Sequence, residues 1–410
     1  MSGHAPRTLG RVAFLHVRTK TLTAAIATAL ALAAAGCSGD SKPGAATSTT
    51  SSPTTSATTT TTTTTPPRPA PKLVGKGLPA DLLATVRPLY LGGAVRAAAP
   101  VGAALAKRRP FTQNVAVAGS VGSWKGTPIA VLTHGSDVTL LQKVHYTWSV
   151  VGGWWPSLGV GRRVPATTMR VLSIGSDARP NQRPDAARGD ALHIIGVDAK
   201  GVGGMVGIPR DSWVPLSVGG TSKINAALIY GGPKAMVKTV QSNTGVPIDG
   251  YVLTGFKGFK AMINAMGGLR YVSSVALRGV DGHTLLKVGT NLLDGPTALG
   301  FARERHHLAN GDFGRSANQG LIIRAGMMVA KQAGPAALPK YLTAIGANVT
   351  TDLTAAEVLN LSAAIYVTDL KSLHNEVAQG SVGMRSGQSV VLLGGSAQSL
   401  FRDIRDGRLG

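Results

Sequence analysis

The chain has 410 residues and a formal net charge of +23, with a single cysteine. One cysteine excludes an intramolecular disulfide, so a hydrophobic core must hold the fold together. The excess of positive charge points to an anionic partner: nucleic acid for an intracellular protein, and lipid head groups, wall polymers or phosphorylated glycans for an exported one.

The N-terminus has the features of an export signal. The first 20 residues contain no acid and four basic residues, Arg7, Arg11, Arg18 and Lys20. Small apolar residues follow at 22–36, which completes the pattern of a basic region and a short hydrophobic region. Because this run is shorter than the roughly 20 residues of a transmembrane helix, we predict that residues 1–36 are a signal peptide. We therefore expect no nucleic-acid partner.

The single cysteine follows directly. The run LAAAGC ends at Cys37 and resembles a bacterial lipoprotein box, although Ala34 stands where such boxes more often carry Leu. We expect Cys37 to be lipidated; the alternative is an exported protein with an incidental cysteine. Residues 37–71 are rich in Ser, Thr, Pro, Gly and Ala and cannot bury enough apolar surface to fold, which predicts a disordered tether to a membrane.

Residues 72–165 are expected to form a small β-rich accessory domain. Two apolar runs flank a turn at 134–137, which is the composition of a β-hairpin. Four tryptophans lie in this segment, Trp124, Trp148, Trp154 and Trp155. They could form a stacking platform for sugar rings, but large aromatic side chains more often build the core of a small domain.

Strand and helix patterns alternate in residues 166–410. Apolar runs predict strands at 169–175, 191–197, 202–208 and 251–254, with a turn at 198–201. Helical spacing predicts helices at 233–245, 256–268 and 318–332, and residues 336–410 continue as mixed α/β. This order indicates an α/β domain whose loops at the strand ends carry the chemistry.

Clusters of charge follow several of these apolar segments: GSDAR at 175–179, RGD at 188–190, IPRDSWV at 208–214, KIN at 223–225 and FARERHHLANGDFGRSANQ at 301–319. Each cluster alone is weak evidence, because a charged residue at a strand end is usually a solvated loop residue. His306 and His307 invite a metal role, but adjacent histidines point in opposite directions on a strand, so we interpret them as loop residues.

Together and in this order, the motifs resemble the LytR-CpsA-Psr family from about residue 168 to the end. The matching motifs also include KINAA at 223–227, YGGP at 230–233, GIPID at 245–249 and GDFGR at 311–315. The resemblance implies a central mixed sheet flanked by helices. It also implies a phosphotransferase on the outer face of the bacterial cytoplasmic membrane, which moves a glycan from a polyprenyl diphosphate carrier to a peptidoglycan hydroxyl and leaves a phosphodiester.

Two carboxylates are candidates for a metal site. Magnesium is commonly held by one or two carboxylates together with substrate phosphates, and Asp177 and Asp190 could supply them if their strands are neighbours. The resemblance implies that they bind Mg²⁺ or Mn²⁺. The alternative is that one of them caps a turn and the other pairs with Arg188.

The arginines suit the diphosphate, because a guanidinium group matches phosphate oxygens with two parallel hydrogen bonds. Phosphoryl transfer needs little beyond positioning and charge stabilisation. By resemblance, the catalytic arginines lining the diphosphate pocket are Arg179, Arg210, Arg303, Arg305 and Arg315. The further candidates for substrate binding are Arg188, Lys223, Asn225 and Gln319.

Spacing gives a more detailed prediction for the last cluster. Arg303 and Arg305 share a face only on extended chain, so we predict a helix over 293–302 followed by an extended arginine pair. Arg315 and Gln319 are four residues apart, and a helix would present both toward the same phosphates.

Apolar residues on two predicted helices could form a slot for the polyprenyl chain: Met236, Val237, Val240, Phe256, Phe259, Met262 and Ile263. The same stripe would also pack a helix on a sheet. Asn318 and Ala191 stand where the family often has arginine and threonine, which leaves the preferred donor open. Two other functions remain: a hydrolase of polyprenyl or other diphosphates, and a non-catalytic lipoprotein that binds anionic wall polymer.

Overall fold

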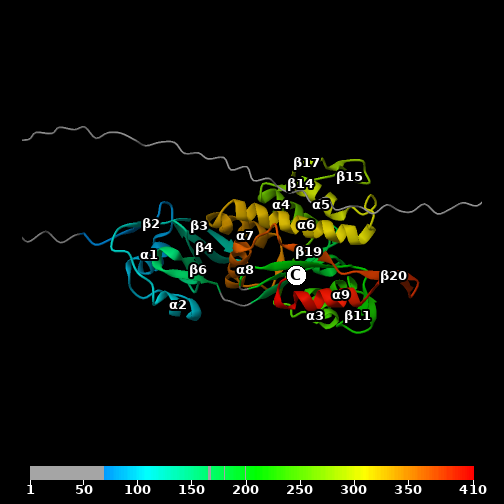
Figure 1. Ribbon diagram of the computed structural model, residues 1–410, viewed down its shortest axis with the longest axis horizontal. Coiled ribbons are helices and arrows are strands. Elements are labelled where there is room, and N and C mark those ends of the chain that lie inside the picture. Colours follow the sequence, from blue (N-terminus) through cyan, green and yellow to red (C-terminus); the bar gives the residue numbers. More distant parts are fainter. Residues whose placement is uncertain (1–68, 165–167, 180, 199) are drawn as a thin grey trace, which may run out of the picture. The chain divides into compact units, whose positions relative to one another are not determined.

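The computed structural model describes residues 69–164, 168–179, 181–198 and 200–410 (Figure 1). The predicted signal peptide, Cys37 and nearly all of the tether lie outside these residues. Within them, no helix is both long enough and apolar enough to cross a membrane.

A six-stranded mixed sheet forms the centre of the fold. Its strands, in spatial order, are β18 (Thr350–Thr351), β13 (Gly250–Thr254), β8 (Met169–Ser176), β9 (Gly189–Val197), β10 (Gly203–Ile208) and β19 (His374–Val377). β8, β9 and β10 pair antiparallel, whereas β13 runs parallel to β8 and β19 runs parallel to β10. Every residue of β10 is buried, as expected for a strand covered on both faces. The four strands predicted in this part of the sequence are confirmed.

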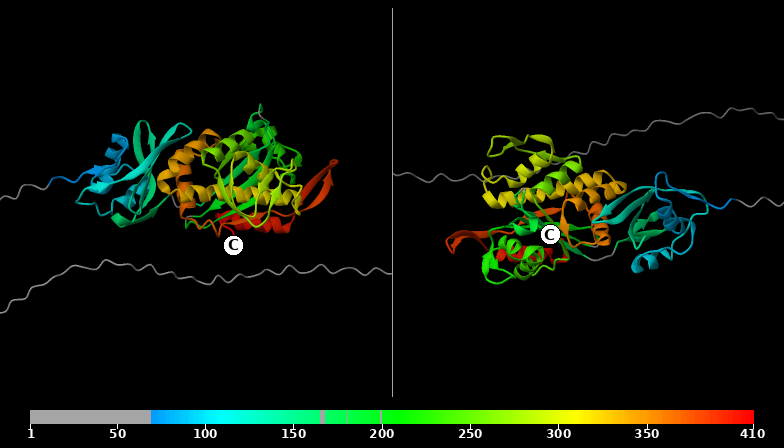
Figure 2. Two further views of the ribbon diagram at one scale, coloured as in Figure 1. Left: turned by 90° about the horizontal axis from the view of Figure 1, so that it is seen from above. Right: turned by 180° about the vertical axis from the view of Figure 1, so that it is seen from behind.

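Helices cover both faces of this sheet (Figures 1 and 2). On one face, Ile194 and Val206 pack with α3 (Ala226–Thr244) and α9 (Gly395–Asp403). On the other, their neighbours Ile195 and Met205 pack with α6 (Gly311–Gln332). Alternate side chains of a strand point to opposite faces, so the near-continuous apolar runs supply both layers. The predicted fold class, a central mixed sheet flanked by helices, is confirmed.

Helix α3 begins earlier than predicted and is kinked. The predicted start at Pro233 follows Gly232, which has φ 69° and ψ −169° inside the helical segment. Glycine adopts this conformation at little cost, and proline suits the first turn of the helix that follows because it needs no N–H partner there. The helix ends, as predicted, at Gly245, which is left-handed with φ 67°.

A subregion of small sheets and helices covers the α6 side. Helices α4 (Phe256–Ala265) and α5 (Gly295–Arg303) pack with α6 and with two small antiparallel sheets. These sheets pair β14 (Leu269–Ser273) with β17 (Gly289–Leu293), and β15 (Leu277–Arg278) with β16 (Thr284–Leu286). Two further pairs are β11 (Trp213–Pro215) with β12 (Thr221–Lys223), and β20 (Gly380–Arg385) with β21 (Gln388–Leu393).

The N-terminal region contains a five-stranded antiparallel sheet: β3 (Ala118–Trp124), β4 (Thr127–His134), β5 (Asp137–Val144), β6 (Thr147–Trp155) and β7 (Val160–Arg163). β4 and β5 form the predicted hairpin. One face packs against α1 (Ala80–Leu91) and α2 (Ala99–Leu105), beside the pair β1 (Leu73–Val74) and β2 (Val115–Ala116). The other face packs against α7 (Leu338–Ala347) and α8 (Ala355–Val367). The β-rich N-terminal region is confirmed.

The tryptophans of this region belong to its cores. Trp124, Trp148 and Trp155 are no more than 3% exposed. Trp154 is half-buried and stacks on Tyr366 of α8 with a centroid distance of 6.2 Å. The interpretation as core residues is confirmed.

Candidate active site

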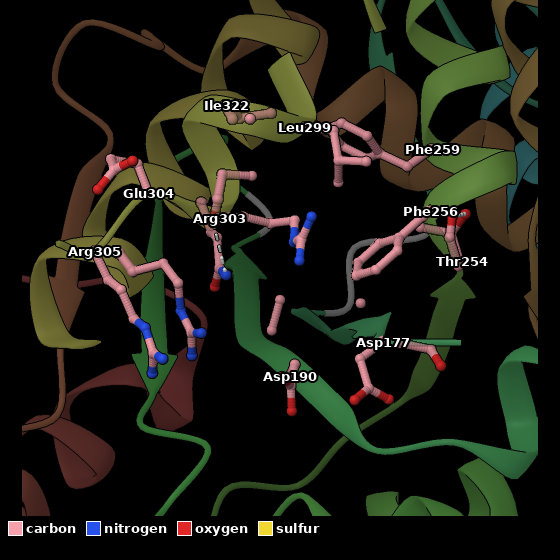
Figure 3. A pocket seen from close by; sticks show the side chains of 18 of the residues that line it. Asp177, Asp190, Thr254, Phe256, Phe259, Leu299, Arg303, Glu304, Arg305 and Ile322 are labelled. Atoms are coloured by element: carbon pink, nitrogen blue, oxygen red, sulfur yellow. Dashed lines mark hydrogen bonds between the residues drawn. The ribbon is translucent and has the colours of Figure 1, made fainter. Parts of the chain in front are cut away.

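A cavity of about 510 Å³ lies between the ends of β8 and β9 and the helices α4, α5 and α6 (Figure 3). Its lining includes eight of the predicted site residues: Asp177, Asp190, Arg179, Arg210, Arg303, Arg305, Arg315 and Gln319. The structure therefore brings together both candidate metal ligands and all five candidate arginines. Three other predicted residues, Arg188, Lys223 and Asn225, do not line the cavity.

The two carboxylates lie at the same end of neighbouring strands. Gly175 pairs with Ala191 and Ser176 with Gly189, so the register shift leaves Asp190 within a β-bulge, and Asp177 follows β8 directly. Figure 3 shows the two side chains next to each other at one side of the cavity. The condition set for a shared metal site, that the two strands are neighbours, is met.

Asp177 is held by the backbone of Arg188. Its Oδ1 accepts a hydrogen bond from the Arg188 N–H at 2.9 Å, while its own N–H donates to the Arg188 carbonyl at 3.0 Å. Its Oδ2 has no hydrogen-bond partner among the described residues. The side chain of Arg188 is exposed, so this residue contributes through its backbone.

Asp190 is shared between two polar side chains from outside its strand. Its Oδ2 forms an ion pair with the Arg210 guanidinium, and its Oδ1 accepts from Asn225 Nδ2 at 3.1 Å. The alternative partner considered from the sequence, Arg188, is thus replaced by Arg210. The hydrogen bond from Asn225 helps to fix the orientation of the carboxylate.

Arg210 connects Asp190 to a larger group of charges. Its Nε lies 3.7 Å from Asp312 Oδ1 and 3.8 Å from Asp211 Oδ2. Arg315 Nη2 lies 2.7 Å from Asp312 Oδ1, and Lys223 Nζ lies 2.9 Å from Asp211 Oδ1. We call the whole set the balanced network, because its three cations meet three carboxylates: Arg210, Arg315, Lys223, Asp190, Asp211 and Asp312.

The two arginines of the balanced network respond differently to burial. Burial alone would lower the pKa of Arg210, but the carboxylates of Asp190, Asp312 and Asp211 outweigh it and raise the pKa above its usual value. Burial dominates at Arg315, and its pKa falls below the usual value despite Asp312. The Nε atoms of both arginines are buried without a hydrogen-bond partner. The carboxylate that offsets the burial of Arg315 is that of Asp312.

The other three arginines, Arg179, Arg303 and Arg305, are exposed, and none forms an ion pair with a described residue. Arg303 instead lies over the ring of Phe256, with its Cζ 4.8 Å from the ring centroid. We call these three residues the free arginines. They carry the uncompensated positive charge of the cavity.

The chain around Arg303 and Arg305 differs in part from the prediction. Helix α5 continues through Arg303, because the N–H of Glu304 still donates to the Gly300 carbonyl at 3.0 Å. Only at Glu304, with φ −64° and ψ 131°, does the chain become extended. The predicted extended pair is thus wrong for Arg303, although both arginines line the cavity.

Helix α6 begins at Gly311 and not near 318, so Arg315 and Gln319 lie on one helix and both line the cavity, as predicted. Gln319 Nε2 donates to the Ala302 carbonyl at 3.2 Å. This hydrogen bond joins α6 to the last turn of α5 next to Arg303.

Glu304 is a site residue that the sequence did not single out. It is only 4% exposed, and its Oε1 accepts from the N–H groups of His306 at 2.7 Å and His307 at 3.0 Å. Burial would raise the pKa of Glu304, but these hydrogen bonds outweigh it and lower the pKa below its usual value. The carboxylate therefore fixes the turn that follows Arg305. His306 and His307 lie in this turn, and no group of three potential metal-binding residues occurs among the described residues.

A second residue missed from the sequence, His193, also lines the cavity. It is 1% exposed, and its Nε2 donates to the Ser316 carbonyl at 2.9 Å. Burial lowers the pKa of His193 to about 4, so the imidazole is neutral at pH 7. It ties β9 to α6 and holds no charge.

Apolar side chains also line the cavity: Phe256, Phe259, Leu299, Ile322 and Ile323. The predicted slot residues Phe256 and Phe259 are among them. Figure 3 shows Phe259, Leu299 and Ile322 in the part of the cavity away from Asp177 and Asp190. The assignment of Met236 and Val240 to the slot is wrong, because α3 packs on the opposite face of the sheet, where both side chains are fully buried. Val237 packs against that same core, Ile263 is buried in the core of α4 to α6, and Met262 does not line the cavity. Helices α5 and α6 supply the wall that the sequence assigned to α3.

Comparisons with known proteins identify the family of this chain. The model of the LytR_cpsA_psr family matches residues 162–401. The chain is 34% identical over 196 residues to the polyisoprenyl-teichoic acid–peptidoglycan teichoic acid transferase TagU of Bacillus mycoides, and 29% identical over 224 residues to TagU of Enterococcus faecalis. These matches cover 47% and 53% of this chain, and 62% and 72% of the relatives; the chain thus spans less than two thirds of the Bacillus protein.

Among solved structures, the chain resembles B. subtilis TagV. The two are 26% identical with a TM-score of 0.52, over 60% of this chain and all of that one. The residues matched by the family model, 162–401, contain the central sheet and the whole cavity described above. Since the family model covers more than half of the chain, the protein belongs to the LytR-CpsA-Psr family.

Proposed function

We propose that this protein is a phosphotransferase that attaches a glycopolymer from a polyprenyl diphosphate carrier to peptidoglycan during cell-wall assembly. One observation carries the proposal: a single cavity is lined both by the free arginines and by a group of apolar side chains. A polyprenyl diphosphate has the matching two parts, a dianionic head and an isoprenoid tail. The names of the TagU relatives, which describe transfer of teichoic acid to peptidoglycan, support this choice.

The dimensions suit the reactive end of such a donor. A cavity of about 510 Å³ lies within the range of about 300–1,000 Å³ that is usual for small-molecule sites. It would hold the diphosphate and the first isoprenoid units, with the rest of the tail outside. Arg179, Arg303 and Arg305 would bind the phosphate oxygens, since no carboxylate has to be displaced from them.

The carboxylate pair fits a Mg²⁺ or Mn²⁺ ion. Asp177 has a free Oδ2, Asp190 lies on the neighbouring strand, and two carboxylates with substrate phosphates are a common donor set for Mg²⁺. When bound, the ion would offset part of the diphosphate charge. Asn225 and Arg210 would keep Asp190 oriented whether or not the ion is present.

In the proposed reaction, the hydroxyl oxygen of the acceptor forms a bond to the phosphorus that carries the glycan. The bond from that phosphorus to the bridging oxygen breaks, polyprenyl monophosphate leaves, and the hydroxyl proton is released. Fixed cations around the phosphates would stabilise the charge that develops. The balanced network would supply rigidity, because its charges hold β9, the loop after β10 and α6 in place.

We further propose that the protein works on the outer face of the cytoplasmic membrane. The basic and apolar pattern of residues 1–36, the lipoprotein-like sequence at Cys37 and the Ser- and Thr-rich tether support this location. Mass spectrometry of the purified protein tests lipidation directly, since a diacylglyceryl group on Cys37 adds a defined mass.

The transfer is tested with full-length protein, a polyprenyl diphosphate glycan and a peptidoglycan oligosaccharide. Mass spectrometry should detect the phosphodiester product with the wild type, and Asp177→Asn should abolish it. Asp281→Asn is a matched control, because Asp281 lines the same cavity but is exposed and pairs with His283 at 3.2 Å. Release of glycan phosphate without linkage would instead indicate a hydrolase. Donor binding without any turnover would indicate a binding lipoprotein.

A further inference from the structure

Exposed apolar side chains gather on the small sheets beside the cavity. Of the 16 large apolar side chains exposed among the described residues, five lie between residues 272 and 292. They are Val272 at 73%, Val275 at 58%, Val280 at 71%, Val288 at 68% and Leu292 at 67% exposure. We call these five residues the aliphatic face. A concentration of this kind usually marks an interaction surface.

The pairing of β14 with β17 shows that two of these residues share an outward surface. Val272 lies opposite Thr290 and Arg270 opposite Leu292, so these four residues occupy one face of the ribbon. The other face carries Leu269 and Leu293, which are buried on α4 to α6. An antiparallel ribbon with one covered face normally has polar residues on the other. Val272 and Leu292 depart from that rule.

Basic residues are interleaved with the aliphatic face. Arg270, Arg278 and Lys287 are exposed within the same segment, and Lys257 is exposed on the adjoining α4. The acids of the segment already have partners: Asp281 pairs with His283, and Asp294 caps α5 by accepting from the Thr297 N–H. The surface is thus aliphatic and cationic at the same time.

One residue of the aliphatic face also borders the cavity. The turn between β15 and β16 contributes Val280 and Asp281 to the cavity lining, next to Leu285 on β16. Val280 therefore belongs to both the aliphatic face and the cavity rim. An apolar tail leaving the cavity at this rim would emerge beside Val280. Figure 1 shows β14, β15 and β17 together at the edge of the molecule beyond α4 and α5.

We propose that the aliphatic face docks on an anionic lipid bilayer. Aliphatic side chains enter the interface between head groups and acyl chains, while arginine and lysine extend along them to reach lipid phosphates. A protein partner fits less well, since protein interfaces are enriched in aromatic anchors and depleted in lysine. The one aromatic residue of the segment, Tyr271, faces inward and contacts Phe301 at 5.3 Å. The inference goes beyond the proposed function and can be tested without it.

The experiment uses the full chain with Cys37→Ser, so that an introduced cysteine is the only thiol. An environment-sensitive fluorophore is attached at Val272→Cys on β14 or, as a control, at Val382→Cys on β20. The two valines are matched, at 73% and 71% exposure on strands of two-stranded antiparallel sheets. On vesicles containing phosphatidylglycerol, we expect a shift to shorter emission wavelength at position 272 and none at 382. A lipid-attached quencher should also quench only the label at 272.

Several outcomes would overturn the proposal. A label at 272 that remains in water while the chain cosediments with the vesicles would show that the aliphatic face does not dock. Equal shifts at 272 and 382 would show non-specific adsorption. Replacing Arg270 and Lys287 with glutamine should weaken docking on anionic vesicles by about fivefold for each charge. Equal binding to vesicles of phosphatidylcholine alone would contradict the role of these charges.

A second measurement separates this inference from the proposed function. The double variant Val272→Glu/Leu292→Glu should lose transfer from a long-chain donor embedded in vesicles while keeping transfer from a short-chain, water-soluble donor. Equal loss with both donors would contradict docking. If the wild type transfers from neither donor, the proposed function fails, and the labelling result still decides whether the aliphatic face contacts lipid.

Discussion

The five arginines of the cavity form two groups with different surroundings. Arg210 and Arg315 have side chains only 19% and 9% exposed and lie within 4 Å of carboxylates. Arg179, Arg303 and Arg305 are exposed and have no ion-pair partner in the described part of the chain. The sequence motifs assign all five arginines to one functional class, whereas their surroundings in the fold divide them into two groups.

This difference separates what holds the site together from what can bind the substrate. A diphosphate that used Arg210 or Arg315 would have to displace Asp190 or Asp312, and an uncompensated carboxylate is costly even when it is only partly buried. The free arginines need no such rearrangement. We therefore expect the balanced network to determine stability and the free arginines to determine donor binding.

The largest effect should come from removing two free arginines. Arg303→Ala/Arg305→Ala loses two charge-assisted hydrogen bonds to the donor, each contributing about 1.5–3 kcal/mol, so transfer should fall by about 150- to 25,000-fold. The free energy of unfolding should change by no more than about 1 kcal/mol, mostly through the lost contact between Arg303 and Phe256. Steady-state transfer and urea denaturation measure the two effects.

Arg385→Ala is the control for this variant, since Arg385 is exposed on β20 and does not line the cavity. It should leave transfer unchanged. If the double variant transferred at the wild-type rate, the distinction between the two groups would be lost. Substantial unfolding of the double variant would also contradict the distinction, because it would show that the free arginines stabilise the fold.

The balanced network should give the largest effect on stability. Arg315→Ala leaves Asp312 without its 2.7 Å partner, and removing one member of a buried ion pair costs about 3 kcal/mol or more. Arg315 is attractive from the sequence as a test of activity alone, but its burial means that lost activity would partly reflect lost structure. Denaturant unfolding should show a lower midpoint with an unchanged slope.

The double variant Asp312→Asn/Arg315→Met tests whether the stability lost in Arg315→Ala comes from the unpaired charge of Asp312. Removing both charges and keeping the volume should restore part of the stability lost in Arg315→Ala. A double variant less stable than Arg315→Ala would show that the arginine stabilises α6 by packing and not by its charge.

Glu304 should give an intermediate effect that depends on pH. Glu304→Gln replaces charge-assisted hydrogen bonds from the His306 and His307 N–H groups with neutral ones, which costs about 1 kcal/mol at pH 7. The folded-state pKa of Glu304 is below its usual value of 4.5. This contribution to stability is therefore complete above pH 4.5 and is lost as the pH falls through the folded-state pKa.

Urea unfolding at a series of pH values measures the difference between Glu304→Gln and the wild type. The difference should shrink below pH 4.5, and an equal difference at pH 7 and pH 3 would contradict the role of the carboxylate. Transfer should fall less than in the double arginine variant, because Glu304 positions Arg305 and does not itself bind the donor.

Much of the fold could be predicted because it depends on short-range patterns. The strands over 169–175 and 202–208 follow from apolar runs, and Gly245 ends α3 where the sequence predicts it. Met236 and Val240 were considered for the polyprenyl slot, but the alternative is correct and they pack α3 on the sheet. Helical spacing shows that a helix has an apolar face, but not which face of the sheet it covers. That choice depends on chain topology.

The membership of the site could be predicted, but its electrostatics could not. Motifs identified Asp177, Asp190 and the five arginines, all of which line the cavity. Arg210 takes its partners from β9, the loop after β10 and α6, and only the tertiary structure brings these together. Arg315, in contrast, pairs with Asp312 three residues earlier on its own helix. Glu304 was missed because a glutamate between two arginines suggests an ion pair, whereas its carboxylate turns toward backbone N–H groups.

The smallest effect should come from the contact that joins the cationic and apolar sides of the cavity. Arg303 lies over the Phe256 ring at 4.8 Å, a contact that contributes about 0.5–1 kcal/mol at an exposed site. Phe256→Leu keeps an apolar wall but removes the ring, so the KM for the donor should rise by about two- to fivefold with kcat nearly unchanged. Phe259→Leu is the matched control on the same helix and should change KM less. If the ring acts by orienting Arg303, then Phe256→Leu should have no further effect in an Arg303→Ala background. An undiminished effect there would mean that Phe256 contacts the isoprenoid directly and that the two sides of the cavity act independently.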